Sequence, residues 1–117
     1  MKVFDCDHNR DLITRARQFL ARNYQMAPET IDMLLNGLKG SLVQEFKTAR
    51  SALARSDSDA LSKSAHSLKG ALRNIGLDEW ASRAERIEKH QADAAEDQLQ
   101  LQAERLLELQ EGLKQLM

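Results

Sequence analysis

Residues that interrupt or crosslink a fold are scarce in this 117-residue chain, which has one cysteine, one proline and five glycines. The lone Cys6 excludes an intramolecular disulfide framework and is typical of a reducing compartment. No run of about 18 apolar residues occurs, and the N-terminus lacks the apolar core of a signal peptide. We therefore expect a cytoplasmic protein that does not cross a membrane.

Neither sign of charge is in excess over the whole chain. With 17 basic and 18 acidic residues the formal net charge is −1, whereas a general nucleic-acid binder needs a basic face. The charges are nevertheless segregated, since residues 93–111 hold six acids and a single base, Arg105. Apolar residues make up 42% of the chain, too many for a disordered protein. We predict a single domain over residues 1–117 that binds no nucleic acid.

The apolar residues recur at intervals of three and four, the period of amphipathic helices, and β-branched residues are sparse. Pro28 suits the first turn of a long second helix. The predicted helices span residues 8–23, 28–55, 57–75, 78–90 and 95–116. Their short connections predict an all-α fold, an antiparallel four-helix bundle with an additional N-terminal helix. The expected inward residues of the last two helices are Trp80, Ala84, Ile87, Leu99, Ala103, Leu106, Leu109, Leu113 and Leu116.

The third helix carries the clearest signals. Its start lies in a Ser-Asp-Ser-Asp segment at residues 56–59, in which every residue is a good N-cap. Asn74 and Gly76 are predicted to supply the left-handed residues that end it. Its expected buried stripe consists of Leu61, Ala65, Leu68, Leu72 and Ile75. The alternating intervals of four and three along this stripe are typical of helices packed in a bundle.

His66 lies away from that stripe on a helical wheel and is therefore predicted to be exposed. Every charged residue between residues 60 and 77 is basic. The residues around the imidazole on this wheel are Ser62, Lys69, Gly70 and Arg73. The sequence thus predicts an exposed imidazole on a rigid helix, in positive surroundings.

An imidazole has an ordinary pKa of about 6.5, so at neutral pH it is largely uncharged and nucleophilic. The nearby cations attract an anion, and Gly70 lacks the side chain that would screen the ring. This pattern indicates phosphoryl transfer with His66 as the covalent carrier and Lys69 neutralising phosphate oxygens. The alternative is that His66 is only a solvated surface residue, which leaves a glycine in mid-helix unexplained.

The segment Ser64–Leu77, SAHSLKGALRNIGL, resembles the signature of histidine-containing phosphotransfer (HPt) domains. That signature is an A-H-x-L-K-G core followed by a glycine at the helix end. The resemblance extends from about Tyr24 to Leu116. It includes the long preceding helix and an Ile87-Glu88 pair on the following one.

The resemblance implies a role for each matched residue. His66 is the phosphoacceptor through Nε2, Lys69 contacts the phosphoryl group, and Gly70 gives a partner access. Glu88 matches a family position whose side chain can hydrogen-bond the second ring nitrogen of the histidine and so fix the tautomer of the ring. The alternative is that Glu88 is a plain surface glutamate. The residues expected to contact the partner are Ser62, Lys63 and Arg73, and no metal ligand is implied.

The resemblance also implies a phosphorelay intermediate, which takes a phosphoryl group from the aspartyl phosphate of one receiver domain and passes it to the aspartate of another. The expected partners are response-regulator receivers and a hybrid sensor kinase. Because the chain has no glycine-rich phosphate loop, we expect no ATP site, no autokinase activity and no cofactor, with magnesium supplied by the receiver. We expect a monomer that docks through the face around His66, with Met33, Leu34 or the first helix adding apolar contacts.

Two other classes of protein present a similar helix. A non-catalytic helical adaptor would use the same face without carrying phosphate, but leaves Gly70 unexplained. The dimerising histidine domain of a sensor kinase predicts an acid or asparagine after the histidine, where this chain has Ser67, and a proline soon after.

Three further motifs are interpreted as incidental. The fragment Asn36–Leu42 echoes the histidine motif but has an amide in place of the nucleophile. Cys6-Asp7-His8 has too few neighbouring ligands for zinc. His90 is expected to be a favourable charge at a helix end.

Overall fold

The computed structural model describes residues 2–89 and 96–117, and the side chains of residues 12–89 and 100–117. These residues form helices and no strand, which confirms the all-α prediction. The elements are α1 (Lys2–Tyr24), α2 (Pro28–Ala54), α3 (Ser58–Asn74), α4 (Asp78–Lys89), α5 (Glu96–Gly112) and a 3₁₀ helix, η2 (Lys114–Leu116).

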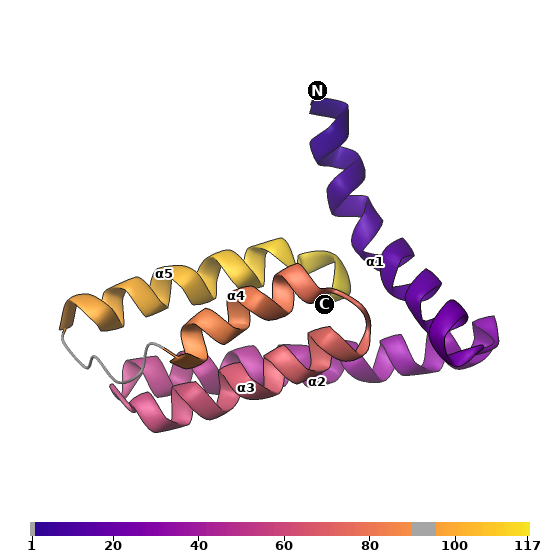
Figure 1. Ribbon diagram of the computed structural model, residues 1–117. Helices are drawn as coiled ribbons and strands as arrows, with labels where there is room; N and C mark the ends of the chain where they lie inside the picture. The colour runs from indigo at the N-terminus through magenta and orange to yellow at the C-terminus, as the bar shows by residue number, and fades with distance from the viewer. Residues whose placement is uncertain (1, 90–95) are drawn as a thin grey trace.

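Helices α2 to α5 lie alongside one another, and α1 meets them at one end (Figure 1). Helix α3 packs against α2 and α4, and α5 packs against the same two helices. The second half of α1 packs on α2 and η2, whereas its first half projects away from the other helices (Figure 1). Arg15 ties α1 to α4 through two bonds to the Glu79 carboxylate, of 2.8 and 2.6 Å.

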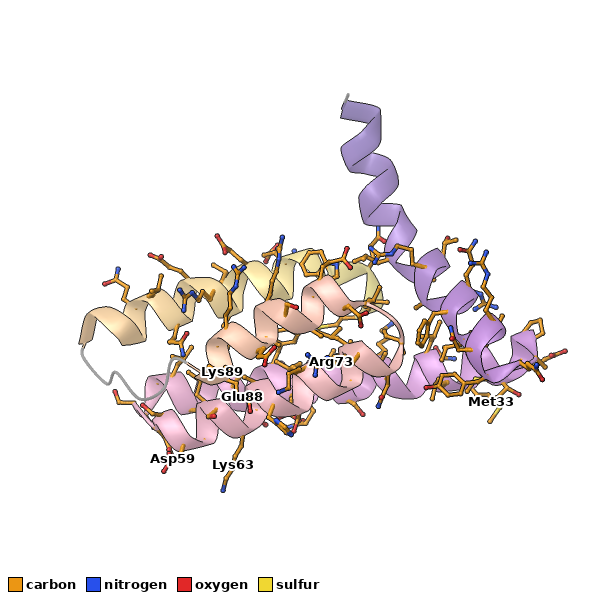
Figure 2. The ribbon with its side chains drawn as sticks, viewed as in Figure 1. Met33, Asp59, Lys63, Arg73, Glu88 and Lys89 are labelled. Carbon is orange, nitrogen blue, oxygen red and sulfur yellow. The ribbon has the colours of Figure 1, made fainter. Side chains whose placement is uncertain are left out.

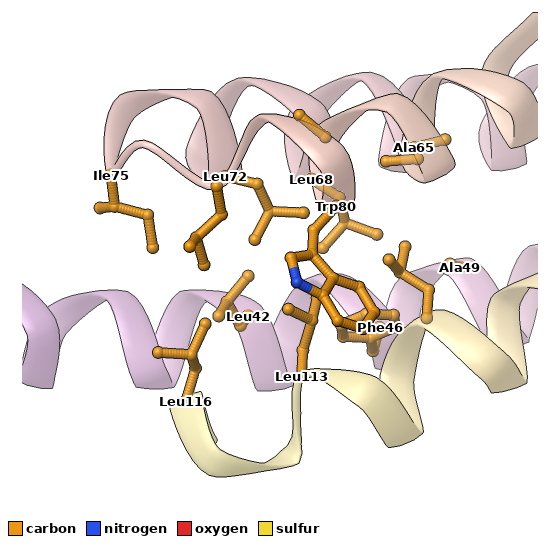
Figure 3. Close-up of a cluster of buried hydrophobic side chains, with 14 of the residues drawn as sticks. Leu42, Phe46, Ala49, Ala65, Leu68, Leu72, Ile75, Trp80, Leu113 and Leu116 are labelled. Carbon is orange, nitrogen blue, oxygen red and sulfur yellow. The ribbon is translucent and has the colours of Figure 1, made fainter. Parts of the chain in front are cut away.

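One cluster of buried apolar side chains joins these helices. All five residues of the predicted α3 stripe are buried in it, and Leu68 and Leu72 meet Phe46 of α2 and Trp80 of α4 in its middle (Figure 3). Burial of each such large side chain stabilises the fold by roughly 1.5–3 kcal/mol. The stripe therefore fixes the rotation of α3 and turns its opposite face to solvent.

Both ends of α3 are set by single residues. Asp57 is the N-cap, and its Oδ1 accepts a hydrogen bond from the Ala60 N–H at 3.1 Å. After the last turn Gly76 adopts φ +80°, and the Phe19 ring occupies the space that a Cβ there would need. The prediction that Asn74 is left-handed is wrong: it is the last helical residue, because Gly76 alone makes the reversal.

Two helix boundaries differ from the prediction. Helix α1 begins at Lys2 rather than at residue 8, because residues 2–7 contain no proline or glycine to stop it. Helix α5 ends at Gly112, which lies against the Trp80 ring, and not at residue 116 as predicted. The chain then forms the 3₁₀ helix η2. The predicted ends at residues 90 and 95 lie outside the described residues.

The inward face of α5 is also corrected at one position. Ala103 is exposed, and its neighbour Gln102 is buried instead. Leu106, Leu109 and Leu113 are buried as predicted. The side chain of Leu99 lies outside the described residues.

Candidate functional site

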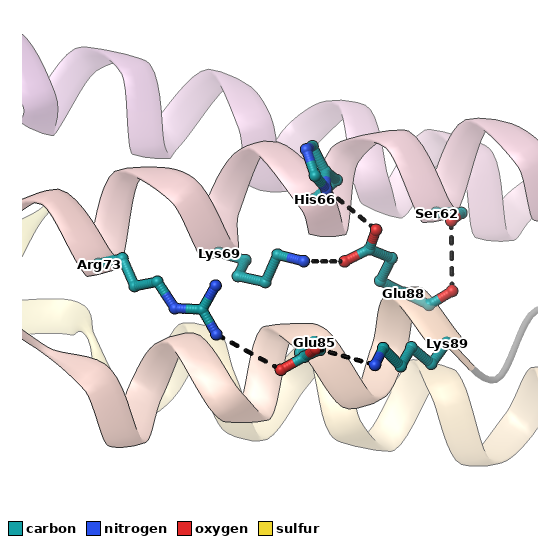
Figure 4. Close-up of polar contacts among 7 residues, drawn as sticks. All are labelled: Ser62, His66, Lys69, Arg73, Glu85, Glu88 and Lys89. Atoms are coloured by element: carbon teal, nitrogen blue, oxygen red, sulfur yellow. Dashed lines mark hydrogen bonds and ion pairs between the residues drawn. The ribbon is translucent and has the colours of Figure 1, made fainter.

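The side chain of His66 is 67% exposed on the outer face of α3, as the helical wheel predicted. Its Nδ1 lies 2.9 Å from Oε2 of Glu88, which reaches across from α4 (Figure 4). A carboxylate can only accept, so Nδ1 carries the proton of this bond. Nε2 is then the basic nitrogen of the neutral ring.

Lys69 lies beside the same carboxylate. Its Nζ is 2.8 Å from Oε1 of Glu88, and its side chain is only 13% exposed (Figure 4). The Lys69 ammonium, followed by the His66 ring, lowers the pKa of Glu88 below its ordinary value of 4.5, although partial burial acts the other way. Glu88 therefore stays ionised at neutral pH and links the imidazole to the lysine.

The last turn of α4, which carries Glu88, is held by side chains from two other helices. The Ser62 hydroxyl of α3 donates to the backbone carbonyl of Glu88 at 3.2 Å. The Gln102 amide of α5 donates to the carbonyl of Ile87 at 2.7 Å. These two bonds hold the backbone around Glu88 against α3 and α5 and so fix its position.

Gln102 was missed by the sequence analysis. A glutamine on a polar, acidic helix gives no signal that it faces inward. Ser62, predicted to touch a partner, is half-buried and occupied by its bond to α4.

A second ion network lies one turn further along the same two helices. Arg73 of α3 and Lys89 of α4 lie 3.5 and 3.1 Å from the carboxylate of Glu85 (Figure 4). Lys89 first, and Arg73 to a smaller extent, lower the pKa of Glu85. Lys63 extends from α3 into solvent (Figure 2).

Gly70 follows His66 by about one turn and is exposed. A Cβ added there would meet no atom within 4 Å, in contrast to Gly76. Packing within the chain therefore does not require a glycine at this position. What the missing side chain provides is open surface next to the imidazole.

Met33 and Leu34 are 75% and 41% exposed, but they lie near the N-terminal end of α2. Figure 2 shows Met33 at one end of the molecule, well apart from Glu88. A small pocket between α2 and the histidine helix is instead lined by Ser41, Leu42, Glu45, Ser67, Leu68 and Ala71. The structure therefore does not bring Met33 and Leu34 to His66.

The described residues contain no group of three or more His, Cys, Asp or Glu placed to hold a metal ion. The side chains of Cys6, Asp7, His8 and His90 lie outside that part of the chain. None of the described helices is long and apolar enough to span a membrane.

The site thus combines an exposed imidazole, with one nitrogen bonded to a carboxylate, with a lysine and an open glycine on the same helix. An imidazole held in this way can act chemically as a nucleophile. The family model of the Hpt domain matches residues 33–117, and the chain belongs to this family. Hpt domains carry phosphoryl groups in phosphorelays, are not kinases, and interact with receiver domains and kinases. Neither the comparison with curated proteins nor that with solved structures gave a match.

Proposed function

We propose that this chain is a phosphorelay intermediate that accepts a phosphoryl group on Nε2 of His66 from one receiver domain and passes it to the aspartate of another. The observation that carries the proposal is the 2.9 Å bond between Nδ1 of a 67% exposed His66 and Glu88. It directs the ring's free electron pair to Nε2, away from the carboxylate.

In the transfer, the Nε2 lone pair attacks the phosphorus of an aspartyl phosphate. The N–P bond forms as the P–O bond to the aspartate breaks, and the carboxylate leaves with that electron pair. The imidazole then carries positive charge, which the Glu88 carboxylate stabilises through Nδ1–H. Lys69 neutralises the phosphoryl oxygens, and Gly70 lets the receiver approach.

We also propose the partners, the source of magnesium and the state in which the protein acts. Receiver domains and a hybrid sensor kinase are the partners, and the chain has no ATP site or cofactor, so magnesium comes from the receiver. Helices α2 to α5 form an antiparallel four-helix bundle, to which α1 is an additional N-terminal helix. The protein is a cytoplasmic monomer. Lys63 and Arg73 contact the receiver.

The test is intact-mass spectrometry after the protein is mixed with a phosphorylated receiver and magnesium. Neutral or alkaline pH preserves phosphohistidine, which is acid-labile. We expect one added phosphoryl group that disappears on brief acid treatment and is absent in His66→Gln. The matched controls His8→Gln and His90→Gln, which alter the other two histidines, should take up phosphate normally.

Circular dichroism of His66→Gln separates a chemical loss from a structural one. The exposed position predicts an unchanged helical spectrum. Binding of several receivers without any mass shift would instead favour a non-catalytic adaptor.

A further inference from the structure

A groove between α4 and α5 is lined by three arginines that take no part in the site around His66. The two helices lie side by side (Figure 1). The groove between them has a volume of about 710 Å³. The lining residues that matter here are Arg83, Arg86, Arg105, Leu107, Glu108 and Glu111. Arg105 is the one base within the acidic stretch 93–111.

The guanidinium groups of the groove lack anionic partners among the described side chains. Arg83 lies over the Trp80 ring at 4.5 Å, which holds its guanidinium at the groove. Nη1 of Arg105 is buried and has no hydrogen-bond partner, and Arg86 forms no ion pair with a described residue. Three cations gathered without a described anionic partner attract a negatively charged ligand.

The acidic residues of the groove do not cancel this charge. The carboxylate of Glu111 forms an ion pair with Lys114, 3.2 Å away. Glu108 then remains as the acidic residue beside the three arginines. Leu107 is 58% exposed at the same groove and offers an apolar contact. The lining thus combines net positive charge with a hydrophobic side chain.

We propose that this groove docks an acidic segment of a partner protein, with carboxylates on the arginines and an apolar side chain on Leu107. Arginine binds carboxylates with two parallel hydrogen bonds and is enriched at protein interfaces. An acidic peptide with apolar side chains fits this lining, which offers both guanidinium groups and a leucine.

The groove and the phosphotransfer site occupy opposite sides of α4. Glu85 and Glu88 pair with side chains of α3 (Figure 4). Arg83 and Arg86 instead line the groove with residues of α5. A segment bound in the groove therefore leaves His66 open to a second protein. The inference concerns a site separate from the proposed phosphotransfer and does not depend on it.

The test measures fluorescence anisotropy of a labelled short peptide of alternating glutamate and leucine, titrated with the full chain at low salt. We expect saturable binding that weakens roughly tenfold in Arg86→Ala and in Arg105→Lys, which keeps the charge but loses the planar fork. Glu108→Gln should bind more tightly because it removes a negative charge from the groove. The control Arg22→Ala, an exposed arginine of α1, should bind like the native chain.

His66→Gln should bind the peptide normally, so failure of the phosphotransfer proposal would not affect this result. The proposal is overturned if the peptide does not bind, if a glutamine-leucine peptide binds equally well, or if Arg86→Ala has no effect. It is also overturned if inorganic phosphate alone occupies the site while the peptide does not. Arginine-dependent dimers in sedimentation, without peptide binding, would equally contradict it and assign the groove to a second copy of the chain.

Discussion

The two oxygens of the Glu88 carboxylate bond different side chains of α3, with Oε2 at the His66 ring and Oε1 at the Lys69 ammonium. One residue of α4 thereby orients the proposed nucleophile and holds a cation close to it. Because Glu88 holds the proton on Nδ1, no further group is needed to leave Nε2 unprotonated.

Loss of the Glu88 charge should alter how stability depends on pH. Because Lys69 lowers the pKa of Glu88 below 4.5, the pairing stabilises the folded chain above about that pH. The contribution is lost as the pH falls through the lowered pKa. We expect Glu88→Gln to lower the free energy of unfolding by about 0.5–1 kcal/mol at neutral pH, and the difference from the native chain to shrink in acid.

Urea unfolding followed by circular dichroism at neutral and acidic pH measures this difference. Glu104→Gln, a change at an exposed glutamate of α5, is the control. A difference between Glu88→Gln and the native chain that stays constant with pH would contradict the role of the charge.

Gly70 provides a second prediction at the residue scale. A methyl group there meets no neighbouring atom, and alanine is favoured over glycine in a helix, so Gly70→Ala should stabilise the fold by about 0.5–1 kcal/mol. The same methyl group lies on the surface over which we propose that a receiver approaches His66. Phosphotransfer should therefore slow by roughly ten- to a hundredfold, since a displacement of about 1 Å can cost that much.

Gly37 offers a matched control for this prediction. It is also an exposed helical glycine with no atom within 4 Å of an added Cβ, but it belongs to α2. Gly37→Ala should raise the unfolding temperature like Gly70→Ala and leave the transfer rate unchanged. Equal transfer rates in both variants would show that the missing side chain of Gly70 does not serve access.

At the scale of elements, the apolar period of the sequence predicted the five helices and the rotation of α3. Hydrophobic spacing is local information, and all five stripe residues are buried where it placed them. The same spacing could not predict contacts between helices. The early end of α5 depends on Gly112 meeting the Trp80 ring, and the inward position of Gln102 depends on a carbonyl of α4.

These contacts between elements determine the position of Glu88. Ser62 and Gln102 bond the final carbonyls of α4 from both sides, so the α4 end is fixed by α3 and α5 together. Sequence motifs identified the histidine, the lysine and the glutamate. They gave no indication of the two polar side chains that hold the α4 end in place.

For the whole molecule, the family motif lies on one side of α4 and the arginine groove on the other. The motif could be predicted because its residues are close in sequence. The groove could not, because Arg86 and Arg105 come from different helices and are adjacent only after folding. The molecule thus offers two separate surfaces, one for chemistry and one proposed for docking.

The most direct test of the account is a two-bond proton–nitrogen NMR spectrum of the histidine side chains before and after phosphorylation by a receiver. We expect Nδ1 of His66 to bear the proton in the unmodified chain, and phosphorus then to appear on Nε2 of the same ring. Phosphorus on Nδ1, or on any residue other than His66, would contradict it.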